Sequence, residues 1–240
     1  MKGIILSGGY GTRLLPLTKV TSKQLLPVYD KPMIMYPLEI LLKAGIKDIL
    51  IIVAPDHAGD YLRLLGSGKE FGVRFAYEIQ DKPEGLATAF LIGENFIDDD
   101  NVTMILGDNI FEDDVAGTIR NFKSGGHIFA KEVPDPERFG VVKFDDQMNA
   151  MKIEEKPKEH LSNYAITGLY IYDSRVVEAA KQAKPSARGE LEITELHNWY
   201  LAKQELKVDI LKGEWIDAGT FETLFRASEL KRKKSQISNK

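Results

Sequence analysis

The sequence predicts an α/β fold in which a doubly wound, mainly parallel, Rossmann-like sheet carries a small antiparallel region. In the first half of the chain, short β-branched runs alternate with amphipathic stretches, as expected for βαβ units. Several of these runs are apolar throughout, which is typical of strands that helices cover on both faces. After Pro134-Asp135-Pro136 strand-like runs follow one another with few helical residues between them, which indicates an antiparallel addition.

The elements of the first half alternate in the order β, α, β, α, β, α, β. Strands are predicted over residues 3–7, 49–54, 73–79 and 102–106, with a further strand over 128–133. Helices are predicted from about 32 to 45, from 56 to 65 and from 86 to 96. Because parallel neighbours need a crossover of this length, the sheet is expected to be parallel here.

In the second half, strands are predicted over 139–144, 148–154 and 164–172, and helices over 174–182 and 191–203. A last strand pair is predicted within 206–217, before a helix that starts near Thr220. This helix is expected to fade into the basic run 231–234, interpreted as a solvated helix end, and the polar segment 235–240 is expected to be frayed.

Length and composition narrow the class of protein. A chain of 240 residues with 43% hydrophobic content suits one domain, and a net charge of −4 does not favour nucleic acid as a partner. The absence of cysteine excludes disulfides, thiolate nucleophiles and Cys-ligated zinc. No apolar run approaches the roughly 20 residues needed to span a bilayer, and no signal peptide is recognisable. A cytoplasmic protein without a membrane partner is therefore expected.

The strongest local signal is the run Gly8-Gly9-Tyr10-Gly11-Thr12-Arg13, which directly follows an apolar strand. Glycines let backbone N–H groups surround phosphate oxygens, and an arginine adds a bidentate donor. The run is not a Walker motif, and it is not the dinucleotide fingerprint either, because Leu14 stands where the third glycine belongs. The run predicts phosphate binding, with an ordinary glycine turn between strand and helix as the alternative.

Two carboxylates follow predicted strands at places where open α/β sheets bind ligands. Asp108 lies in Leu106-Gly107-Asp108-Asn109, and Asp217 lies in Trp215-Ile216-Asp217-Ala218-Gly219. Magnesium commonly takes one or two carboxylates and completes its shell with water and phosphates, so this pair would suffice if folding unites it. A lone aspartate at such a place equally often caps a turn. Lys23, taken without the glycine run, is more readily a surface lysine.

Two further segments carry side chains suited to a ligand. Strand alternation would send Glu155 and Lys156 to different faces, and a charged edge strand is the alternative reading. Gln80 and Gly85 combine an amide side chain with a free backbone N–H, which together suit the edge of a pyrimidine. The four histidines show no zinc-type spacing and no Gly-x-Ser-x-Gly elbow exists, so hydrolase chemistry finds no support.

Taken in order, these motifs resemble those of the sugar-phosphate nucleotidylyltransferases. The resemblance covers Lys2 to about Phe225 and is closest to members that transfer a thymidylyl group to glucose 1-phosphate. It rests on Gly8 to Leu14 with Pro16 and Thr18, Lys23, Gln80 to Ala87, Gly107-Asp108-Asn109, Phe139 to Val142, Glu155-Lys156-Pro157, Ser162 to Tyr170, Ala187 to Thr194, and Trp215 to Gly219.

The resemblance implies that dTTP and glucose 1-phosphate are converted to dTDP-glucose and pyrophosphate with Mg²⁺ as cofactor. It implies a division into a nucleotide-binding core (1–133), a sugar-side region (134–217) and a C-terminal helix (218–240). By similarity, Arg13, Lys23, Asp108 and Lys156 are catalytic, and Asp108 and Asp217 hold the metal. The residues implied to bind the nucleotide are Gly8, Gly9, Gly11, Thr12, Arg13, Lys23, Gln24, Gln80, Gly85 and Asp108. Those implied to bind the sugar phosphate are Asn109, Gly140, Glu155, Lys156, Ile166, Tyr170 and Arg188.

Longer members of this family continue past the Trp-x-Asp motif with helices that build an effector site and part of an interface. The resemblance therefore implies a short form of the enzyme and leaves undecided whether feedback inhibition occurs. It also implies a homo-oligomer, without deciding between a dimer and a tetramer. Three other functions remain as alternatives. They are a UTP-using or other sugar-1-phosphate nucleotidylyltransferase, a nucleotide-sugar sensor without turnover, and a dinucleotide-dependent oxidoreductase, which the absent third glycine disfavours.

Overall fold

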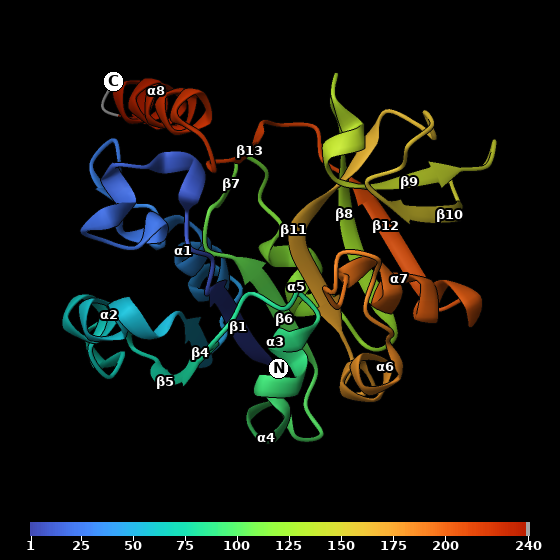
Figure 1. The fold of residues 1–240 in the computed structure, drawn as a ribbon, viewed down its shortest axis with the longest axis horizontal. Helices are drawn as coiled ribbons and strands as arrows, with labels where there is room; N and C mark the ends of the chain where they lie inside the picture. Colours follow the sequence, from blue (N-terminus) through green and yellow to red (C-terminus); the bar gives the residue numbers. More distant parts are fainter. Residues whose placement is uncertain (239–240) are drawn as a thin grey trace.

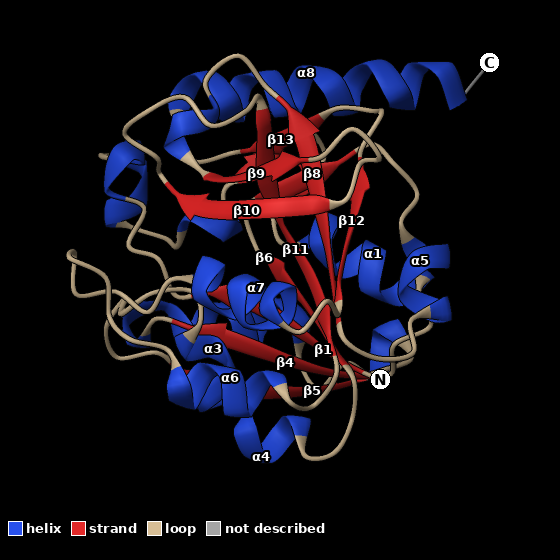
Figure 2. Cartoon of the chain, turned by 90° about the vertical axis from the view of Figure 1, so that its right-hand side faces the viewer, coloured by secondary structure: helices blue, strands red, loops and turns tan. Residues whose placement is uncertain are grey.

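Residues 1–238, which the computed structural model describes, form one large nine-stranded sheet with helices on both faces (Figures 1 and 2). Four parallel strands make its first half: β1 (Lys2–Ser7), β4 (Asp48–Val53), β5 (Arg74–Ile79) and β6 (Val102–Leu106). Their spatial order is β5-β4-β1-β6, so the chain winds outward from β1 in both directions. The predicted doubly wound, mainly parallel sheet is confirmed.

Alternate side chains of the parallel strands enter two different hydrophobic cores. Ile4 of β1 packs with Phe90 and Leu196 on one face, whereas Ile5 packs with Leu38 and Tyr61 on the other. The first face is covered by α3 (Thr88–Ile92), α4 (Glu94–Ile97), α6 (Val176–Gln182) and α7 (Ile193–Ala202). The second face is covered by α1 (Met35–Lys43), α2 (Ala58–Leu65) and α5 (Ala116–Asn121). Burial on both faces explains why the central strands β1, β4 and β6 are apolar at most positions, whereas β5 at the edge of the sheet carries the exposed Arg74 and Glu78.

The second half of the sheet begins with β11 (Tyr164–Tyr172), which runs antiparallel to both β6 and β8 (Gly126–Glu132). The antiparallel pair β9 (Gly140–Phe144) and β10 (Ala150–Glu155) extends from β11, as predicted. β12 (Leu206–Ile210) instead lies parallel to β8 at the edge of the sheet.

The predicted strand pair within 206–217 is wrong, because its two strands belong to different sheets. β13 (Trp215–Asp217) pairs with β7 (Asn109–Phe111), a strand that the sequence analysis missed. The segment between β12 and β13 is attached to the loop after β7 instead of forming a hairpin. The backbone N–H groups of Gly213 and Glu214 donate to the carboxylates of Asp113 and Glu112, respectively.

The remaining departures are local. The predicted helix 86–96 is divided at Gly93 into α3 and α4, and α5 was not predicted. Between β1 and α1 the chain forms three single 3₁₀ turns and the short hairpin of β2 (Pro27–Val28) and β3 (Lys31–Pro32). None of the helices within the described residues is long and apolar enough to cross a bilayer.

The C-terminal helix α8 (Phe221–Ser238) does not fade at the basic run. It packs through Leu224 and Ala227 over the β7–β13 sheet (Figure 1). Lys231 donates to the carbonyl of Phe111, and Lys234 pairs with Glu112 at 3.1 Å. The prediction of a solvated helix end is therefore wrong for these two lysines, which fasten the helix to the domain. The predicted frayed end is wrong as far as residue 238, and residues 239–240 lie outside the described part.

Candidate active site

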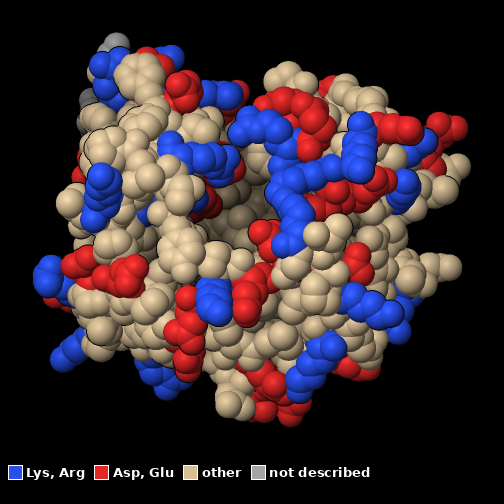
Figure 3. Space-filling model, viewed as in Figure 1, with Lys and Arg blue, Asp and Glu red and all other residues tan. Residues whose placement is uncertain are grey.

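The candidate site lies at the carboxyl ends of β1 and β6, the two central strands. The glycine run follows β1 and Asp108 follows β6, so the sheet itself brings the two motifs together. Asp217 arrives separately: the β7–β13 pairing aligns it with Asn109, and the backbone N–H of Ala218 donates to the carbonyl of Asp108 at 2.9 Å. Figure 3 shows the resulting hollow, with lysine, arginine and acidic side chains on its rim.

Two cavities occupy this region, and five residues line both: Leu86, Leu106, Asp108, Glu155 and Lys156. The first, the nucleotide-side cavity, is also lined by residues predicted to contact the nucleotide, namely Gly8, Gly9, Lys23, Gln24, Gln80 and Gly85. The second, the sugar-side cavity, is also lined by residues predicted to contact the sugar phosphate, namely Asn109, Gly140, Ile166 and Tyr170, and by Asp217. The shared lining makes the two cavities neighbouring compartments that meet at Asp108 and Lys156.

A buried ion pair joins Lys23 to Asp108 at the junction. Burial opposes both charges, but the mutual attraction holds the pKa of Asp108 below its ordinary value and that of Lys23 above it. Asn109 also supports the carboxylate, because its Nδ2 donates to Asp108 Oδ1 at 3.0 Å. Asp108 is thus held as a fixed negative charge in a water-poor position.

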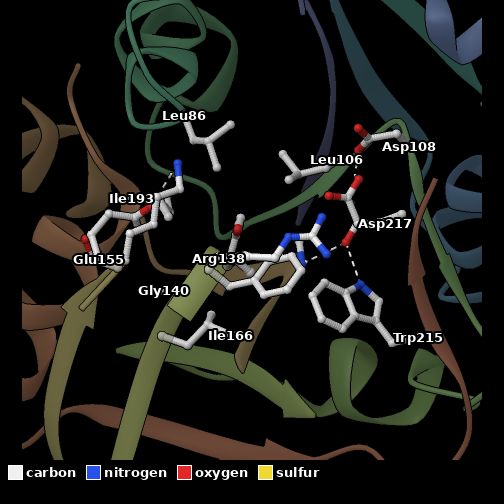
Figure 4. Close-up of a pocket in the computed structure, with 16 residues that line it drawn as sticks. Leu86, Leu106, Asp108, Arg138, Gly140, Glu155, Ile166, Ile193, Trp215 and Asp217 are labelled. Carbon is white, nitrogen blue, oxygen red and sulfur yellow. Dashed lines mark hydrogen bonds and ion pairs between the residues drawn. The ribbon is translucent and has the colours of Figure 1, made fainter. Parts of the chain in front are cut away.

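Asp217 lies in the same region without such a partner. Its pKa is raised to about 6, first because burial disfavours the carboxylate and second because Asp108 is negatively charged nearby. Figure 4 shows the two aspartates together on one side of the cavity, with Glu155 on the opposite side. Arg13 also approaches, since a Cβ at Gly219 would lie 2.8 Å from Arg13 Nη2 and 3.1 Å from Asp217 Oδ1. Asp217 therefore lies near both a like charge, Asp108, and the guanidinium of Arg13.

Asn109 is fixed by three hydrogen bonds, although it was predicted only as a sugar contact. Its Oδ1 accepts from Trp215 Nε1 at 2.6 Å and from the Gly168 N–H at 2.9 Å. With its Nδ2 bonded to Asp108, the side chain connects the turn after β6 to β11 and β13. Asn109 therefore positions the metal-candidate carboxylate while it lines the sugar-side cavity.

Glu155 and Lys156 line both cavities, so the predicted division between opposite faces is wrong. The alternation ends with β10 at Glu155, and Lys156 has a positive φ of 44° that turns the chain back. Lys156 Nζ lies 3.7 Å from Glu155 Oε1. Burial raises the pKa of Glu155, and the nearby Glu192 adds to the effect.

Several predicted residues occupy places that the motifs did not reveal. Arg188 pairs with Glu192 at 2.8 Å and lines the nucleotide-side cavity rather than the sugar side. Gln24 lines that cavity too, but Ser22 and Tyr61 both donate to its Oε1. Gly11, Thr12 and Arg13 form the turn after the glycines and line neither cavity.

Sequence reasoning gave no role to some residues that line the cavities: Arg138, Phe139, Glu190, Thr194 and Trp215. Each stands within or beside a recognised motif, which was the available signal, but nothing in the sequence indicates which way its side chain points. Within residues 1–238 no group of three or more His, Cys, Asp or Glu side chains is arranged to hold a metal ion. Any ion here would depend on the two aspartates and on ligands from the substrate.

The chain belongs to the nucleotidyl transferase family, whose profile matches residues 2–234. Glucose-1-phosphate thymidylyltransferase of Neisseria gonorrhoeae is 54% identical over 100% of this chain and 85% of that protein. The enzyme of the same name from Mycolicibacterium smegmatis is 53% identical over 97% of this chain and 82% of its own.

Solved structures agree with this placement. A Bacillus anthracis structure that carries the name of a glucose-1-phosphate thymidylyltransferase, in complex with sucrose, has a TM-score of 0.91 and 50% identity over 96% of this chain and 94% of its own. A UDP-glucose pyrophosphorylase complexed with UDP-glucose has a TM-score of 0.85 and 26% identity over 97% of this chain and 98% of its own.

Proposed function

We propose that the chain transfers a thymidylyl group from dTTP to glucose 1-phosphate, giving dTDP-glucose and pyrophosphate. The observation that carries the proposal is the meeting of two cavities at Asp108 and Lys156. A base would lie between Gln80 and Gly85, and a sugar would lie beside Glu155 and Tyr170. The α-phosphate of the nucleotide would then stand at the junction, where the two substrates react. The names of the similar enzymes support the same pair of substrates.

The residues at the junction suit an in-line displacement at the α-phosphorus. The oxygen of the sugar phosphate forms the new bond to phosphorus as the bond to pyrophosphate breaks. A sugar phosphate is largely dianionic at neutral pH, so the attack needs no general base. Lys156 would hold this phosphate, and Arg13 and Lys23 would neutralise the departing pyrophosphate.

The two aspartates fit Mg²⁺, which takes carboxylate oxygens and leaves the rest of its shell to water and phosphates. The fit is visible in Asp217, whose pKa is raised because burial and the nearby Asp108 outweigh the attraction of Lys23, Arg13 and Arg138. Asp108 and Asp217 would hold the ion at the junction of the two cavities. When bound, Mg²⁺ neutralises phosphate charge in the transition state.

The test is pyrophosphate release with Mg²⁺ and glucose 1-phosphate, comparing dTTP, UTP, CTP, ATP and GTP at equal concentrations. The expected result is that dTTP gives the highest kcat/KM. If another nucleotide leads, the reaction class stands and the base assignment falls. Silence with all five nucleotides, together with binding of dTDP-glucose in calorimetry, would instead establish a sensor.

UTP is the second candidate nucleotide, because the fold is shared with a UDP-glucose pyrophosphorylase. Thymine and uracil differ by one methyl group, which a pocket distinguishes by only about 1–3 kcal/mol. We therefore expect measurable turnover of UTP at a lower kcat/KM than that of dTTP. A kcat/KM for UTP above that for dTTP would contradict this order.

Gly8→Ala is expected to raise the KM for dTTP about tenfold, equivalent to about 1.4 kcal/mol of binding. A Cβ at this position would overlap Gln80 Oε1, so the glutamine would have to leave its place in the cavity. The clash involves the flexible end of a side chain, so the fold should persist. Gly59→Ala on α2 is the control, because its Cβ would meet nothing within 4 Å. An unchanged KM in folded Gly8→Ala would contradict the prediction.

A further inference from the structure

The nucleotide-side cavity is lined by the Gln80 side-chain amide, which is hydrogen-bonded to a residue outside the cavity lining. Gln80 follows β5, is buried, and its Nε2 lies 2.8 Å from Thr88 Oγ1 at the start of α3. The Thr88 hydroxyl lies 2.6 Å from the carbonyl oxygen of Gly85, to which it donates. Thr88 is itself buried and lies behind the wall that faces the cavity.

This chain of hydrogen bonds determines which end of the amide faces the ligand. A threonine hydroxyl has one proton, and here the Gly85 carbonyl accepts it. The hydroxyl can therefore only accept from Gln80, so the NH₂ group must turn toward Thr88. Gln80 Oε1 is then directed to the Gly8 side of the cavity. Among the described residues, this oxygen has no hydrogen-bond partner.

Gly85 supplies the complementary group. Its backbone has a φ of +109°, and a Cβ would overlap the backbone of Leu191, so only glycine fits. The backbone on both sides of Gly85 is hydrogen-bonded to Leu191, since Ala87 N donates to Leu191 O and Leu191 N donates to Glu84 O. Within residues 1–238 no acceptor pairs with the Gly85 N–H. The cavity thus offers one acceptor and one donor from adjoining walls.

We propose that Thr88 is a positioning residue that sets base specificity by locking the Gln80 amide with its oxygen toward the nucleotide. This inference rests on the proposed function and deepens it. An acceptor beside a donor matches the N3–H and a neighbouring carbonyl of thymine or uracil. Cytosine presents an acceptor at N3 and an amino group at C4, so its edge opposes the locked amide. The pocket accepts bases with an imide edge and rejects cytosine.

The test compares Thr88→Val, Thr88→Ser and wild type by the ratio of kcat/KM for dTTP over CTP. Valine keeps the shape but removes the hydroxyl, so the amide is free to turn and the ratio should fall at least about tenfold. Serine keeps the hydroxyl and should restore the ratio. A merely structural role would lower the melting temperature of Thr88→Val and leave the ratio unchanged.

Calorimetry of dTTP and CTP binding separates this inference from the proposed function. If wild type releases no pyrophosphate but prefers dTTP, and Thr88→Val loses that preference, the locking role stands without the reaction. A ratio within twofold of wild type in folded Thr88→Val would overturn the inference, as would a Thr88→Ser variant that behaves like valine. Equal binding of dTTP and CTP by wild type would overturn it as well.

Discussion

Asp217→Asn should reduce the kcat for pyrophosphate release at least about a hundredfold while the protein stays folded. Asparagine keeps the size and polarity of the side chain but removes one of the two charges proposed to hold Mg²⁺. The structural cost should be small, because Asp217 forms no ion pair among the described residues, and burial together with Asp108 already disfavours its charge. In metal-free buffer the melting temperature should therefore equal or exceed that of wild type.

Thermal unfolding with and without Mg²⁺ gives a second measure of the same prediction. A ligand that binds only the folded state raises its stability, so Mg²⁺ should raise the melting temperature of wild type and raise that of Asp217→Asn much less. Asp99→Asn is the matched control, since Asp99 is exposed and precedes β6, whereas the site lies beyond the carboxyl end of that strand. Full activity of Asp217→Asn at ordinary Mg²⁺ concentrations would remove this carboxylate from the mechanism.

Acidification from pH 7 to pH 5 should cost about 2 kcal/mol of the free energy of unfolding through one histidine, His197. His197 is fully buried on α7, with Nδ1 2.6 Å from the Tyr172 hydroxyl, and burial lowers its pKa to about 3. The unfolded chain binds a proton near the ordinary pKa of 6.5, whereas the folded chain does not. Stability therefore falls as the pH drops below 6.5 and continues to fall until about pH 3.

Urea unfolding of wild type and His197→Gln at pH 7, 6 and 5 measures this contribution. Glutamine does not titrate, so the variant should lose about 2 kcal/mol less than wild type over this range, whatever its stability at pH 7. Comparing how the free energy of unfolding changes with pH in the two proteins removes the contribution of other groups. These include His127, whose pKa is also lowered by burial. Parallel pH profiles would show that His197 is protonated in the folded protein or does not differ between the two states.

Local patterns allowed much of the fold to be predicted. Apolar runs bounded by turns located the central parallel strands β1, β4 and β6, because strands that helices cover on both faces are apolar at most positions. The strand 164–172 was predicted with the bounds that the structure has. Short elements were missed, since β7 has three residues and α5 has six, too few for a periodicity to emerge.

The sequence by itself determined the family, the ordered motifs and the candidate charges, because each motif consists of neighbouring residues. Only the tertiary structure decided which of these residues meet. Asp108 and Asp217 are joined by the β7–β13 pairing, and Lys156 turns toward Glu155 through a positive φ. Thr88 acts on Gln80 through a side-chain hydrogen bond across a turn. Such contacts depend on register, backbone angle and rotamer, which follow from the packing of the whole chain rather than from the residues next to each motif.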